Sequence, residues 1–177
     1  MSTENRFLHN ADCNAMFYNP QQWQPDGGPY TAEALHRYVH QAADIGYDTF
    51  LCNPNAQVPV YPSKAVRSWL EGYERGDESF FRQSSPEKNR RMARMADLYL
   101  DLEEAGVDLL AEIADACREA GMDPWLSIRM NDLHGWKNPE EPRNCELFRD
   151  PQFRLNARMP NPDASPETRS LGGLNYE

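Results

Sequence analysis

The chain has 177 residues, of which 40% are hydrophobic, so it is long and apolar enough for a single packed domain. Its formal net charge of −10 argues against binding to a nucleic-acid backbone, which requires basic patches. No apolar run approaches the roughly 20 residues that a bilayer-spanning helix needs, so no membrane contact is expected.

The first predicted strand covers residues 13–18, a short apolar segment that Asn19-Pro20 closes. Residues 21–29, which contain a glycine pair, predict a loop. Near Thr31 the apolar residues begin to recur at helical spacing, and this pattern predicts a helix.

Gly46 is expected to end that helix, and residues 47–52 predict a second strand. Asn53-Pro54-Asn55 would stop this strand, because proline cannot continue a ladder of hydrogen bonds. A long connection rich in aromatic and charged residues then covers positions 56–84.

Ser85-Pro86 supplies an N-cap and a first-turn proline for a further helix, which Gly106 would end. Its predicted inward face consists of Met92, Met95, Tyr99 and Leu102. Asp108 is expected to cap the next helix and Gly121 to end it. The predicted inward residues of this second helix are Leu110, Ile113, Ala114 and Cys117.

A third strand is predicted at residues 124–130, and the six prolines that follow Gly135 make residues 136–177 loop-rich. Two segments, 43–52 and 119–127, share the order helix end, glycine, apolar residue, aspartate, strand. This repeated junction is typical of consecutive βα units.

Alternating strands and helices predict an α/β fold with a parallel sheet and right-handed crossovers. A complete (β/α)8 barrel needs roughly 250 residues, whereas three βα units are recognisable here. We therefore expect residues 1–177 to be a single domain that forms an incomplete TIM-type barrel, of about the first three βα units.

Polar residues cluster directly after the third predicted strand: Arg129, Asn131, Asp132 and His134. The carboxyl ends of parallel strands are where binding and catalysis occur in such folds. The alternative is a solvated turn in which Asp132 acts as a cap.

Three phrases resemble the amino-terminal part of glycoside-hydrolase-like (β/α)8 barrel proteins, relatives of family-10-like glycosyl hydrolases. They are residues 48–57 (Asp-Thr-Phe-Leu-Cys-Asn-Pro-Asn-Ala-Gln), residues 61–64 (Tyr-Pro-Ser-Lys) and residues 125–134 (Trp-Leu-Ser-Ile-Arg-Met-Asn-Asp-Leu-His). The resemblance implies a carbohydrate substrate, and it implies that most acidic catalytic residues belong to later strands of the barrel.

Asp132 is the candidate catalytic residue, and Arg129 would keep it ionised. Glycoside hydrolysis requires two carboxyl groups, so a single carboxylate cannot complete the mechanism. Asp132 is the only carboxylate at a predicted strand end with polar neighbours.

The candidate substrate-binding residues are Asn53, Asn55, Tyr61, Arg129, Asn131 and His134. Amides can both donate to and accept from sugar hydroxyls, and an aromatic ring can cover the face of a sugar. Each has a structural alternative: turn formation for the two asparagines beside Pro54, and cover of the core for Tyr61 and for Trp23.

The four cysteines lie far apart without CxxC spacing, so neither a zinc cluster nor a disulfide framework is indicated, and no metal or cofactor is expected. Cys52 and Cys117 are expected as buried thiols in a reducing compartment. The amino terminus has no secretory pattern, so we expect a cytoplasmic protein; the oligomeric state stays open.

Two other functions stay open at this point. One is a metal-dependent sugar isomerase on a similar barrel, which would need several His, Asp and Glu ligands at strand ends. The other is an inactive or binding-only fragment.

Overall fold

The structure is a computed structural model that describes residues 6–129, 138 and 140–153. These residues fall into two compact units, which we describe separately. The sheet unit contains residues 6–54 and 93–128, and the loop unit contains residues 55–92 and the described residues from 129 onward.

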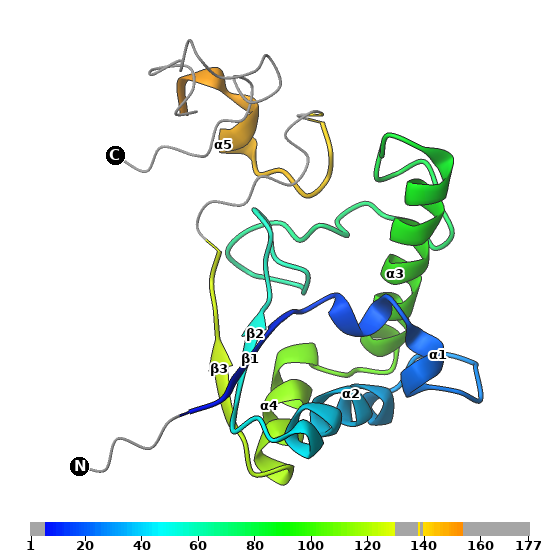
Figure 1. Cartoon of the computed structure of the whole chain (residues 1–177). Coiled ribbons are helices and arrows are strands. Elements are labelled where there is room, and N and C mark those ends of the chain that lie inside the picture. The colour runs from blue at the N-terminus through cyan, green and yellow to red at the C-terminus, as the bar shows by residue number, and fades with distance from the viewer. Residues whose placement is uncertain (1–5, 130–137, 139, 154–177) are drawn as a thin grey trace. The chain divides into compact units, whose positions relative to one another are not determined.

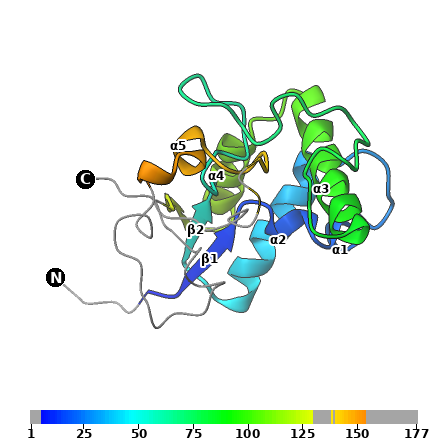
Figure 2. The same ribbon diagram turned by 90° about the horizontal axis from the view of Figure 1, so that it is seen from above.

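The sheet unit is built on three parallel strands: β1 (Leu8–Asp12), β2 (Thr49–Asn53) and β3 (Asp123–Leu126). Their order is β1-β2-β3, with β2 in the middle (Figure 2). The fold is therefore α/β with a small parallel sheet, as the alternation of elements predicted.

The prediction of the first strand was wrong. Residues 8–12 form β1, and the apolar segment assigned to the strand instead contains a short 3-10 helix at Ala15–Phe17. The polar residues of β1 made this segment look unlike a strand. Met16 and Phe17 are buried, but they belong to the 3-10 helix. The helix α1 (Pro20–Trp23) occupies part of the predicted loop, with Pro20 in its first turn.

The two predicted helices that cover the sheet are confirmed as α2 (Ala32–Ile45) and α4 (Leu109–Glu119). They lie beside each other on the same side of the strands (Figure 1). Leu35 and Val39 of α2 and Ile113 of α4 are almost fully buried. Apolar residues at helical spacing thus form the layer between helices and sheet.

The long helix α3 (Pro86–Glu104) begins at the predicted proline. Its predicted inward residues Met92, Met95, Tyr99 and Leu102 are all buried. β3 is shorter than predicted and ends at Leu126, although the Ser127 N–H still donates to the Cys52 carbonyl at 2.8 Å.

Each of the three main helices of the chain ends in the same way. The three junctions are Gly46-Tyr47-Asp48, Gly106-Val107-Asp108 and Gly121-Met122-Asp123. In each, the glycine has a positive φ, and the N–H of the next residue donates to a carbonyl five positions earlier at 2.8–3.1 Å.

The aspartate that follows then fixes the next element. Asp48 accepts from the Phe7 N–H at 3.0 Å, and Asp123 pairs with Arg6 at 2.5 Å, so both hold the entry of β1 against the sheet. Asp108 caps α4 by accepting from the N–H groups of its first turn, at 3.1 Å each.

The core of the loop unit is aromatic. Trp69, Tyr73, Phe80 and Phe81 contact one another with ring centroids 5.1–5.5 Å apart. Two short turns of helix follow later in the chain, α5 (Glu146–Arg149) and a 3-10 turn at Pro151–Phe153. None of the helices in the described ranges is both long and apolar enough to cross a membrane.

Candidate functional site

The two faces of the sheet have different characters. His9 contacts Tyr38 of α2 and Phe50 of β2, so the side chains of His9, Ala11, Phe50 and Cys52 point toward the helices. Because side chains alternate along a strand, the intervening residues point the other way. This opposite face consists of Leu8, Asn10 and Asp12 of β1, Thr49, Leu51 and Asn53 of β2, and Asp123 and Trp125 of β3.

Polar residues of the opposite face gather at the carboxyl ends of the strands. Asp12 is the last residue of β1, and it is aligned with Asn53, the last residue of β2. The Cys13 N–H donates to the Asn53 carbonyl at 2.9 Å, which fixes this alignment. Asp12 is half-buried and Asn53 is buried, with 4% of its surface exposed.

Asp12 was missed in the sequence. The interpretation that Asp132 is the only strand-end carboxylate depended on a first strand at residues 13–18, and it was wrong because the strand ends at Asp12. The signal was present in the alternation of Leu8, Asn10 and Asp12 with His9 and Ala11. It was overlooked because three of these five residues, His9, Asn10 and Asp12, are polar.

In the layer between the sheet and the helices, burial shifts the pKa values of titratable groups in the direction that favours their neutral forms. A hydrogen bond to Cys52 and burial raise the pKa of Cys13 well above its ordinary value. Burial also raises the pKa of Tyr38 to about 12 and lowers the pKa of His9. Cys52 and Cys117 are both buried, as predicted.

In the loop unit, Asn55 contacts the backbone of Arg129. Its Oδ1 accepts from the Arg129 N–H at 3.2 Å, and its Nδ2 donates to the Arg129 carbonyl at 3.0 Å. Nδ2 also lies 2.6 Å from the Ala56 carbonyl. The predicted substrate-binding residue Asn55 therefore anchors the segment that carries Arg129.

Further side chains of the loop unit bind backbone groups in the same way. The Oε1 of Gln57 accepts from the Cys145 N–H at 3.0 Å. Arg67 donates to the carbonyls of Pro142, at 2.9 Å, and Asn144. These contacts hold residues 142–145 against the 55–67 segment. Tyr61, which lies within the 55–67 segment, is half-buried.

The remaining predicted residues divide into two groups. Trp23 packs edge-on against Tyr38 at 5.1 Å and is buried, so it belongs to the core of the sheet unit. Asn131, Asp132 and His134 lie outside the described residues.

A second cluster of titratable side chains lies on the helices of the sheet unit: His36, His40 and Glu119. The sequence signal was the spacing of the two histidines, four residues apart on one helix face. Their glutamate partner comes from a different helix, which spacing along the chain cannot reveal.

Comparison with known proteins assigns no family to this chain. No protein-family model matches it. A search of curated proteins likewise found no match.

Proposed function

We propose that this chain forms the first βα units of a carbohydrate-active, glycoside-hydrolase-like (β/α)8 barrel, in which the carboxyl edge of the sheet faces the glycoside. The observation that carries this proposal is the alignment of Asp12 with Asn53 at the ends of neighbouring parallel strands. In barrels of this type the loops at that edge carry the active site.

Among the described residues, no strand pairs with the outer edge of β3, and the exposure of this edge supports a larger sheet. Trp125, Leu126 and Ile128 are 52%, 60% and 61% exposed, although each is a large apolar residue. A groove of about 230 Å³ runs along this edge. Its lining is mainly apolar and comes from β2, β3 and α4: Phe50, Cys52, Leu110, Ile113, Ala114, Arg118, Pro124, Trp125 and Leu126.

A fourth strand parallel to β3 would pair with this edge, and its crossover helix would pack beside α4 into the groove. Both additions follow the rule that consecutive βα units lie next to each other with right-handed crossovers. In the closed barrel, the opposite face with Leu51 and Trp125 would become the interior.

The chemistry of the proposed site depends on carboxylates. Asp132, which follows β3 in the chain, and Asp12 are the two candidates within this sequence. Each is proposed separately as one of the two carboxyl groups that glycoside hydrolysis needs, either the general acid or the nucleophile or base, with its partner carboxyl group on a later strand of the barrel. Asn53 and Asn131 would bind sugar hydroxyls, because a carboxamide offers both donors and an acceptor.

A hydrolysis assay tests the proposal. The chain is incubated with cello-, xylo-, malto- and chito-oligosaccharides, and products are separated by chromatography. We expect binding of one class, and any cleavage that accompanies it should fall at least a hundredfold in Asp132→Asn. Asp26→Asn removes one exposed carboxylate from a loop of the sheet unit and serves as the control.

The three outcomes have distinct meanings. Cleavage lost in Asp132→Asn and kept in Asp26→Asn supports hydrolysis within this chain. Binding without cleavage supports a binding-only role, or a catalytic pair that later strands complete. The absence of both binding and cleavage would overturn the proposal.

No observation favours the isomerase alternative. Within the described residues, the strand ends carry Asp12 and Asn53 but no histidine. A metal-dependent isomerase would need several ligands there.

A further inference from the structure

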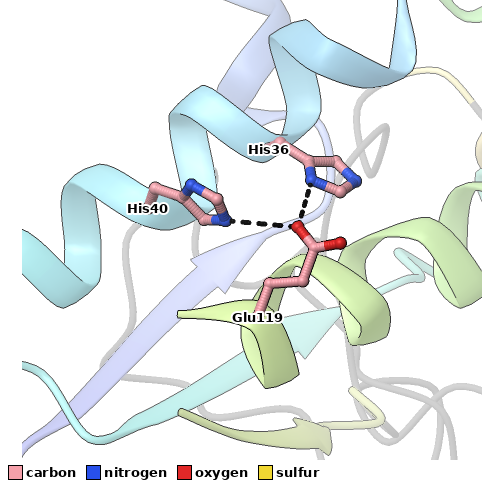
Figure 3. Close-up of side chains that lie close together, drawn as sticks. All are labelled: His36, His40 and Glu119. Carbon is pink, nitrogen blue, oxygen red and sulfur yellow. Dashed lines mark hydrogen bonds and ion pairs between the residues drawn. The ribbon is translucent and has the colours of Figure 1, made fainter. Parts of the chain in front are cut away.

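A cluster of histidine and glutamate side chains joins α2 to α4. His36 and His40 lie one turn apart on α2 and point toward Glu119, the last residue of α4 (Figure 3). The Nδ1 of His36 lies 2.9 Å from Glu119 Oε2, and the Nε2 of His40 lies 3.8 Å from the same oxygen. One carboxylate oxygen thus faces two imidazole nitrogens.

These three atoms have the spacing of a metal-ligand set. All lie within 4.8 Å of one another. Two atoms bound to a tetrahedral zinc ion at about 2.1 Å are separated by about 3.4 Å. The distances of 2.9 and 3.8 Å lie on either side of that value, so small side-chain rotations would place all three atoms on one ion.

The other ring nitrogen of His36 is already oriented. Its Nε2 lies 2.7 Å from Oε1 of Glu112, which lies two turns before Glu119 on the same face of α4. When Nε2–H donates to this carboxylate, Nδ1 carries the lone pair that faces Glu119. Metal-bound histidines almost always donate their second N–H in this way, which fixes the tautomer.

His40 provides a second, independent observation. Its Nε2 is shielded from solvent, yet it forms no hydrogen bond within the described part of the chain. A buried polar atom without a partner costs free energy. A metal ion between Nε2 and Glu119 would supply that partner.

We propose that His36, His40 and Glu119 bind a divalent transition-metal ion, with Zn²⁺ as the best match, and that water completes its coordination. Two imidazoles and one carboxylate are the ligands that zinc takes in many proteins. The net charge of −10 also favours a cation over an anion.

The position of the cluster indicates a structural role. Glu119 ends α4, and β3 begins only four residues later at Asp123. The ion would therefore lie near the amino-terminal end of the strands, away from Asp12 and Asn53. In parallel α/β folds, that end contributes to stability. The site would clamp α2 to α4 and is separate from the carbohydrate proposal.

Calorimetric titration of the tag-free, chelator-treated chain with zinc chloride tests the site. We expect one ion to bind per chain, and the thermal unfolding midpoint to rise by about 5–10 °C at a hundredfold excess of free zinc over Kd. With Co²⁺ in place of zinc, we expect the visible absorption bands of a four-coordinate ion.

Four variants locate the ion. His40→Ala and Glu119→Gln should each abolish binding and the rise of the midpoint. Glu112→Gln should weaken binding by about 10–100-fold, because Glu112 only orients His36. Asp26→Asn, which removes an exposed carboxylate in the loop before α2, should bind as the unchanged chain does.

His40 and Glu119 have side chains that are 42% and 57% exposed, so neither substitution empties the core. Circular dichroism of each variant in chelator checks that the helices persist. Two results would overturn the site: no zinc binding by the unchanged chain, or unchanged binding in both His40→Ala and Glu119→Gln.

Discussion

The side-chain amide of Asn55 forms hydrogen bonds with both backbone groups of Arg129, at 3.2 Å to the N–H and 3.0 Å to the carbonyl. The two residues are 74 positions apart in the sequence. Asn55 therefore replaces, with its side chain, the contacts that a neighbouring strand would make. This contact fixes the start of the segment that leads toward Asp132.

Replacing Asn55 tests this anchoring role. Asn55→Ala removes both hydrogen bonds to Arg129 and should lower the free energy of unfolding by about 1–3 kcal/mol. Asn55→Asp keeps the acceptor but places a carboxylate against a carbonyl, so it should be no more stable than the alanine variant. Urea unfolding measures both, with Asn19→Ala, an exposed asparagine, as the control. An equal loss in Asn55→Ala and Asn19→Ala would contradict the anchoring role.

The positive φ of Gly46 predicts that any other residue at this position lowers the stability of the fold. Gly46 has a φ of +104° with no atom within 4 Å of where a Cβ would lie, so strain there comes from the backbone alone. Gly46→Ala should cost about 1 kcal/mol or more, because L-residues disfavour this conformation. Gly46→Asn should cost less, since asparagine tolerates positive φ. Thermal unfolding compares the two, and a more stable alanine variant would refute the explanation.

His9 predicts a pH dependence of stability. Burial lowers its pKa from the ordinary 6.5, so the unfolded chain takes up this proton at a higher pH than the folded chain does. Stability from the neutral ring is therefore fully present above about pH 6.5 and is lost as pH falls through the lower folded pKa. His9→Phe keeps an aromatic ring beside Tyr47 and Phe50 and should flatten this part of the profile. Unfolding midpoints from pH 7 to about pH 5 test it, and parallel profiles would contradict it.

The outer edge of β3, which pairs with no strand in the described ranges, predicts self-association. Leu126→Lys places a charge on this edge and should reduce association, because charged edge residues prevent strand-to-strand pairing. Its side chain is exposed, so stability should change by less than about 0.5 kcal/mol. Ile45→Lys, at a similarly exposed apolar residue at the end of α2, is the matched control. Sedimentation velocity reports the association, and equal behaviour of the two variants would show that the edge is not the cause.

The helices could be predicted from the sequence because local signals define them. The Leu35–Val39 spacing, the Asp108 cap and the glycines after each helix act within a few residues of one another. Asp108 caps α4 as predicted, through two hydrogen bonds to its first turn. Interactions between residues close together in sequence can be predicted from the sequence alone.

The first strand and much of the site could not be predicted, because their signals depend on distant partners. β1 is mostly polar and becomes a strand by pairing with β2, about 40 residues later. Asn55 contacts Arg129, and His40 lies beside Glu119, only once the chain has folded. Misplacing β1 also concealed Asp12, the carboxylate now at the centre of the proposed site.

The most direct test of the proposed carbohydrate site is a titration of the chain with the four oligosaccharide classes, followed by amide NMR. We predict that one class shifts the backbone signals of Cys13, Asn53 and Ser127, which lie at the carboxyl ends of β1, β2 and β3. In Asp12→Asn the affinity for that class should fall by about tenfold or more, the loss expected for one charge-assisted hydrogen bond. If no class shifts these signals, or if Asp12→Asn binds as the unchanged chain does, the carboxyl edge is not a carbohydrate site.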